Sequence, residues 1–190
     1  MLLLSASLVF ASVAAVPAEA KKKPRKCPAF APVEPDSGSG ETAEALEAPV
    51  IKVTDKATAD TPIVLEYEHG MALWASWDQE PIIEDTVFFN FQIESSRPAP
   101  GLYVFQEWAK EPPSDMDLLL YSAGQRVAYS GSSNAFPMPT PIEETGAWGL
   151  ESIPGYATST CAGYTVESRA FATTGEAMTL SVWLGEDVAE

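Results

Sequence analysis

Histidine and cysteine are scarce in this chain, which has one His and two Cys among 190 residues. No Gly-x-Ser-x-Gly turn and no His-Glu-x-x-His motif occurs, so neither a nucleophile elbow nor a zinc-protease helix is recognisable. The single histidine, His69, follows Glu66 and Glu68 at the end of a predicted strand. A histidine beside acids is a candidate general base or metal ligand. Because no nucleophile motif accompanies it, we interpret His69 as a turn residue.

Positive charge is also sparse. The chain has 11 Lys and Arg against 27 Asp and Glu, which gives a formal net charge of −16 at pH 7. Such a surface repels phosphate backbones and anionic lipid headgroups, so the sequence predicts no nucleic-acid partner. Solubility outside the cell explains the acidity more simply than specific binding of cations does.

Long hydrophobic runs are missing after the first twenty residues. Residues 2–16 form an apolar run too short for a permanent anchor, and Ala18-Glu19-Ala20 places small residues where a signal peptidase cleaves. We therefore predict a signal peptide over residues 1–20. The mature protein is then secreted or held in the cell envelope, with no membrane span. An uncleaved anchor is the alternative.

The two cysteines, Cys27 and Cys161, are expected to pair. Disulfides form and persist in exported proteins, and an even number of cysteines is typical of such pairing. The bond would join the start of the mature chain to a late strand. A pair of free thiols is the alternative that the compartment disfavours.

Residues 21–49 have the composition of a linker. Lys21–Lys26 is a basic stub, which we interpret as a charge cluster at the processing site, with binding to acidic polymers as the alternative. Pro28–Pro49 is rich in Pro, Glu, Ala, Ser and Gly and has few large apolar residues. Such a segment cannot bury enough surface to order itself, so we predict disorder, with at most one helical turn near Glu41–Glu47.

Residues 50–190 are predicted to form a single all-β domain. Short alternating segments are separated by Pro, Gly, Ser and Asp, and no convincing amphipathic helix occurs, which is typical of an antiparallel β-sandwich or jelly roll. The expected strands are 50–54, 62–68, 71–77, 86–94, 102–107, 116–122, 126–130, 147–153, 163–171 and 178–184.

One inner face of the sandwich can be predicted from the alternation, because apolar residues occupy one parity of each strand while the other is mostly polar. Its expected members are Val87, Phe89, Phe91, Ile93, Met116, Leu118, Leu120, Tyr164, Val166, Leu180 and Val182.

The stretch Asp115–Ser130 contains a strand, a glycine turn and a second strand. Met116, Leu118 and Leu120 share one face at period two, so Asp115 and Asp117 share the other. This Asp-x-Asp-Leu-x-Leu-Tyr strand resembles the signature of bacterial pre-peptidase C-terminal domains, which are small β-sandwiches of secreted proteins. Gly163-Tyr-Thr-Val-Glu-Ser-Arg169 is similar to the closing strand of that family, and Glu151-Ser-Ile153 to the strand before it.

The resemblance covers residues 86–184, about half of the chain. Two parts depart from the family pattern. The Pro-rich loop over residues 135–141 is not typical of it, and residues 50–77 add strands that the family core does not need. The resemblance implies a fold and an extracellular setting but no reaction.

Asp115 and Asp117 are the best candidate site. Two carboxylates on one strand face lie about 7 Å apart at Cα, close enough to approach one hard cation if loop oxygens from Glu111, Ser114 and Asn134 complete its shell. Calcium is the expected ion, and some members of the resembled family bind it. The alternative is a solvated strand edge whose charges deter pairing with other strands.

Tryptophans are the second candidate for binding. Trp74, Trp77, Trp108 and Trp183 could stack on a ligand such as a sugar, although core packing is the more common role of Trp in a small sandwich. Paired acids, Glu66 with Glu68 or Glu143 with Glu144, also suggest a glycosidase. That chemistry needs carboxylates facing each other across a cleft, which adjacent acids in one strand do not provide.

These observations favour a non-enzymatic, exported β-sandwich acting as a binding or structural accessory module. Its partner would be an extracellular polymer or protein, and calcium at Asp115 and Asp117 would be its only cofactor. The alternative is a secreted hydrolase that uses carboxylates, or a carbohydrate-binding protein, acting on extracellular polysaccharide. No recognisable catalytic motif supports the hydrolase.

Overall fold

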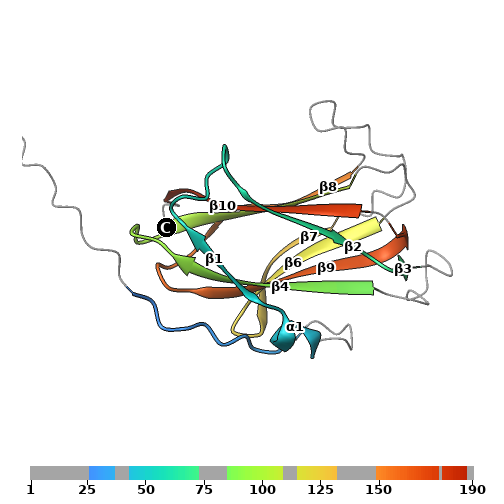
Figure 1. Cartoon of the computed structure of the whole chain (residues 1–190), viewed down its shortest axis with the longest axis horizontal. Coiled ribbons are helices and arrows are strands. Elements are labelled where there is room, and N and C mark those ends of the chain that lie inside the picture. Colours follow the sequence, from blue (N-terminus) through green and yellow to red (C-terminus); the bar gives the residue numbers. More distant parts are fainter. Residues whose placement is uncertain are drawn as a thin grey trace, which may run out of the picture.

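The computed structural model describes residues 26–36, 43–72, 85–108, 115–131, 149–175 and 177–187. These residues form two facing β-sheets and one short helix, so the chain has the predicted all-β sandwich fold (Figure 1). Within them, no helix has the length and apolar character needed to cross a membrane.

Every strand expected from the sequence is present, with ends that shift by a few residues. The elements are α1 (Glu44–Glu47), β1 (Val50–Thr54), β2 (Ile63–Glu68), β3 (Met71–Ala72), β4 (Asp85–Glu94), β5 (Pro100–Trp108), β6 (Asp115–Ser122), β7 (Gln125–Gly131), β8 (Gly149–Ala157), β9 (Gly163–Thr174) and β10 (Ala177–Asp187). The remainder of the strand predicted over residues 71–77 lies outside the described residues.

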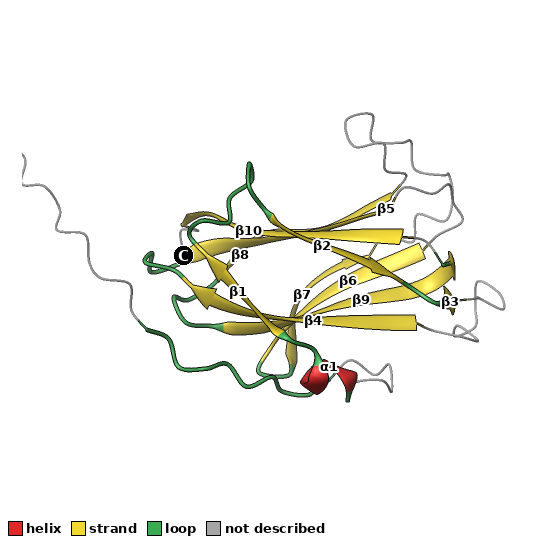
Figure 2. Ribbon diagram, viewed as in Figure 1, coloured by secondary structure: helices red, strands yellow, loops and turns green. Residues whose placement is uncertain are grey.

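The first sheet has the order β1-β4-β9-β6-β7, with β3 paired to β9, and the second has the order β2-β10-β5-β8 (Figure 2). All neighbours are antiparallel except β1 and β4, which run parallel with Val50 opposite Asn90. The sequence predicts antiparallel pairing throughout, so this pair is a departure. The chain passes through β2 in the other sheet between β1 and β4, and only such a long connection permits parallel neighbours.

The predicted inner face is confirmed for most of its residues. Phe91, Leu118 and Leu180 are fully buried in the main core, which also contains residues of β1, β5 and β8. Met116 belongs to a second, smaller cluster with Trp108 and Met178. Val87 is only half-buried.

The N-terminal segment, residues 26–36, lies against the outer face of the first sheet and differs from the predicted linker. Figure 1 shows it in blue on the same side of the sandwich as α1. Gln92 donates a side-chain hydrogen bond to the carbonyl of Pro28, and Asp36 N donates to Gly124 O over 2.8 Å. The ring of Phe30 lies where Gly163 would otherwise carry a Cβ.

Helix α1 confirms the single turn that was expected, and it too contacts the sheet. Ala45 is fully buried, and the amide of Asn90 donates to Ala45 O over 2.6 Å and to Ala48 O over 2.9 Å. Asn90 and Gln92 therefore bind to main-chain carbonyls on the outer face of β4, while Phe91 points into the core. Hydrogen bonds from side-chain amides to main-chain carbonyls thus order the N-terminal segment and α1, which have too few apolar residues to be ordered by hydrophobic burial alone.

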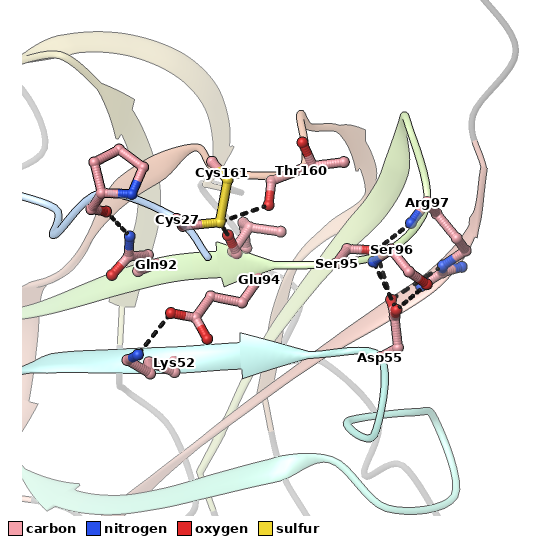
Figure 3. Close-up of a disulfide and its surroundings, with 12 residues drawn as sticks. Cys27, Lys52, Asp55, Gln92, Glu94, Ser95, Ser96, Arg97, Thr160 and Cys161 are labelled. Atoms are coloured by element: carbon pink, nitrogen blue, oxygen red, sulfur yellow. Dashed lines mark hydrogen bonds and ion pairs between the residues drawn. A yellow bond between two sulfur atoms is a disulfide. The ribbon is translucent and has the colours of Figure 1, made fainter. Parts of the chain in front are cut away.

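Cys27 and Cys161 form the predicted disulfide, with Cα atoms 5.3 Å apart (Figure 3). The bond ties the N-terminal segment to the start of β9. Lys52 and Glu94 form an ion pair of 2.6 Å between β1 and β4 near the same end of the sandwich.

Asp55 holds the turn after β1 to the turn after β4. Its carboxylate accepts hydrogen bonds from Ser95, Ser96 and Arg97 (Figure 3). Burial alone would raise the pKa of this carboxyl, but the donated hydrogen bonds outweigh burial and lower the pKa to about 2.

Replacing Leu118 with Ala tests the predicted core. Leu118 is fully buried in the main core, so the cavity should lower the free energy of unfolding by about 2 to 5 kcal/mol in urea titrations. Val127→Ala on β7 is the control, because Val127 is 36% exposed and should cost far less. Equal losses for the two variants would contradict the proposed inner face.

Candidate functional site

Asp115 and Asp117 occupy the outward parity of β6, as predicted. In the first sheet Asp117 lies opposite Gly131 of β7 and Arg169 of β9. Tyr129 Oη donates to Asp117 Oδ2 over 3.1 Å. A Cβ on Gly131 would overlap both the Tyr129 hydroxyl and the Asp117 carboxylate, so only glycine leaves room for this hydrogen bond.

Burial, together with neighbouring acids, raises the pKa values of both carboxyls. Burial and the charge of Glu151 raise the pKa of Asp115. Burial raises the pKa of Asp117 to about 6, helped by Asp115 and Glu151, while the Tyr129 hydrogen bond and Arg169 act in the opposite direction. The chain therefore concentrates negative charge at the start of β6, and a cation there would relieve the repulsion.

The described residues supply only part of a calcium site. Among them, no group of three or more His, Cys, Asp or Glu side chains is arranged to hold a metal ion. Glu111, Ser114 and Asn134, which the sequence suggests as further ligands, lie outside the described residues. Calcium takes six to eight oxygen ligands, so Asp115 and Asp117 could contribute two of its carboxylates but not the whole shell.

The raised pKa of Asp117 gives a pH dependence that can be measured. Its carboxyl is protonated more readily in the folded protein, with a pKa of about 6 against an ordinary value of 3.8. The protonated Asp117 carboxyl therefore adds to the free energy of unfolding at low pH, and this contribution is lost as the pH rises from 4 to about 6. Without calcium, Asp117→Asn should therefore stabilise the protein at pH 7, by about 1 kcal/mol after solvent screening, and flatten this pH profile.

Thermal unfolding between pH 3.5 and 8 provides the measurement. Asp60→Asn, which changes an exposed acid in the loop before β2, should leave the wild-type profile intact. A destabilised Asp117→Asn protein at pH 7 would contradict the assignment.

His69 does not behave as a simple turn residue. It follows β2 as predicted, but its side chain is buried, with 3% of the residue exposed. Nδ1 lies 2.8 Å from Asp85 Oδ2, and Nε2 lies 2.7 Å from Ser168 Oγ, to which Tyr67 Oη also donates. The interpretation of His69 as a turn residue misses this role, because the imidazole, directly after β2 of the second sheet, bonds to Asp85 of β4 and Ser168 of β9 in the first.

This Asp85–His69–Ser168 arrangement has the order and distances of a hydrolytic triad. Its placement does not suit catalysis. Ser168 is fully buried and shares its parity on β9 with the core residues Val166 and Ala170. Its hydroxyl therefore points between the two sheets, where it is closed off from solvent. These side chains are better explained as a buried hydrogen-bond network that joins the two sheets.

Ser168→Ala separates these two roles. Loss of the hydroxyl removes one buried partner of His69 and of Tyr67, which should lower the free energy of unfolding by about 1 to 3 kcal/mol in urea. Ser181→Ala, on the outer face of β10, should be close to neutral. We expect no labelling of wild-type Ser168 by a fluorophosphonate, and stoichiometric labelling of the folded protein at that residue would overturn the structural assignment.

The predicted tryptophan platform is divided by the fold. Trp74 and Trp77 lie outside the described residues. Trp108 is buried in the smaller core cluster. Trp183 lies on the outer face of the second sheet, where it contacts Tyr103 and Phe105, neither of which sequence reasoning singled out. The alternation of β5 could have identified both rings. Leu102 and Val104 point into the core, so Tyr103 and Phe105, which alternate with them, must point outward.

The acids proposed for a glycosidase gain no opposing partner in the described structure. Glu66 and Glu68 are exposed on the same outer face of β2. Glu143 and Glu144 lie outside the described residues. The carboxylate that does lie near the Asp115 site is Glu151, which accepts a hydrogen bond from Ser130.

No protein-family model matches the chain, and no curated protein matches it. Among solved structures, it is similar to the pre-peptidase C-terminal domain of a collagenase from Bacillus anthracis. The likeness covers 71% of this chain and 95% of that one, with 9% sequence identity and a TM-score of 0.41. The family is the one that the Asp115–Ser130 stretch resembles.

Proposed function

We propose that the chain is an exported, non-enzymatic accessory module that binds an extracellular polymer or protein. The observation that carries the non-enzymatic part is the orientation of Ser168, whose hydroxyl points into the core in spite of its triad-like partners. The Cys27–Cys161 bond supports the export, because such bonds persist in oxidising compartments.

Calcium bound at Asp115 and Asp117 is the second part of this proposal. The raised pKa values of both carboxyls support it, since a cation would favour their charged forms. Calcium at this position would bind across the start of β6, next to the end of β7, where Tyr129 and Gly131 lie.

The melting temperature tests the calcium site directly. Millimolar calcium should raise it by several degrees at pH 7, because an ion that binds only the folded state stabilises that state by mass action. Asp117→Asn should abolish the increase, whereas Asp60→Asn should retain it. A melting curve that calcium leaves unchanged in the wild-type protein would reject the site.

A further inference from the structure

The outer face of the second sheet differs in chemistry from the rest of the molecule. Strands β2, β5, β8 and β10 contain no Lys or Arg. The first sheet, in contrast, includes Lys52, Arg126 and Arg169. The outward residues of the second sheet are therefore aromatic, apolar, small and polar, or acidic.

Three aromatic rings form a row on this face. Trp183 lies 5.4 Å from Tyr103 and 4.8 Å from Phe105 between ring centroids, with interplanar angles of 5° and 16°. Tyr103 also packs over Gly155 and Gly185, where any Cβ on Gly185 would overlap the ring. The rings are partly exposed, and near-parallel stacking on one another fixes their positions.

Two carboxylates lie beyond the Phe105 end of this aromatic row. Thr179 on β10 has Glu66 as its partner on β2 and Glu107 as its partner on β5, so the two acids lie about 10 Å apart across three strands. Glu107 is two residues from Phe105 on the same face of β5. Glu68 and the exposed Val64 lie on the same outer face of β2 as Glu66.

The described residues do not cover this face as they cover the first sheet. Residues 26–36 and α1 lie on the outer side of β4 and β9, and Figure 2 shows them on the side away from β2 and β10. The row of rings therefore stays partly exposed among the described residues, with Glu107 next to Phe105 at one end and Arg97, which donates to Gly185 O, at the Tyr103 end.

We propose that this face binds a Lys- and Arg-rich segment of another polypeptide. Cations are attracted to aromatic ring faces, and Glu66 and Glu107 would pair with further basic side chains of the same segment. A neutral sugar is a poorer match, because it has no positive charge to pair with Glu66 and Glu107. The inference rests on the proposed binding role and names the partner's chemistry.

Titration of fluorescent peptides against the mature protein tests the proposal. We expect an Arg-rich peptide to bind several-fold more tightly than a Lys-rich peptide of equal charge, because guanidinium groups also stack on rings. Glu66→Gln with Glu107→Gln should weaken binding about tenfold. Trp183→Leu, checked for folding by circular dichroism, should remove the preference for Arg.

The matched control is Glu44→Gln with Glu47→Gln on α1, which changes the net charge equally on the opposite side. It should alter binding less than about twofold if the site is local. Equal weakening by the two double variants would mean general charge attraction and overturn the proposal. Binding of a neutral oligosaccharide in place of the peptides would also overturn it, as would self-association lost in Glu66→Gln with Glu107→Gln. None of these results depends on calcium at Asp117.

Discussion

Burial of both faces of the first sheet around β4 and β9 is the constraint on which the rest of the structure depends. Its inner face packs against the second sheet through residues such as Phe91 and Leu118. Its outer face carries buried Asn90 and Gln92, which need hydrogen-bond partners because an unpaired buried amide costs free energy. The N-terminal segment and α1 supply those partners, so the disulfide at Cys27 holds in place a segment that the sheet requires.

The strands could be predicted because their signal is local. Alternation of apolar and polar residues identifies β4, β6 and β10 within a few residues, and the same parity places Leu118 and Leu180 in the core. The contacts of residues 26–36 could not be predicted, because they consist of side-chain amides binding main-chain carbonyls. Such bonds leave no periodic pattern in a sequence rich in Pro and Glu.

The candidate site was predictable in part for the same reason. Asp115 and Asp117 lie two residues apart, so their shared face follows from strand geometry. Tyr129, Glu151 and Arg169 come from three other strands, and their effect on Asp117 depends on sheet order. The environment of His69 was missed because Ser168 is 99 residues away in the sequence.

The parallel pairing of β1 with β4 has a kinetic consequence. Val50 meets Asn90 only after the chain has passed through β2, and Cys27 meets its partner 134 residues later in the sequence. Contacts between such distant residues raise the contact order, and proteins of high contact order fold slowly. The amino-terminal part of this protein should therefore reach its native position late, after the hairpin of β6 and β7 has formed.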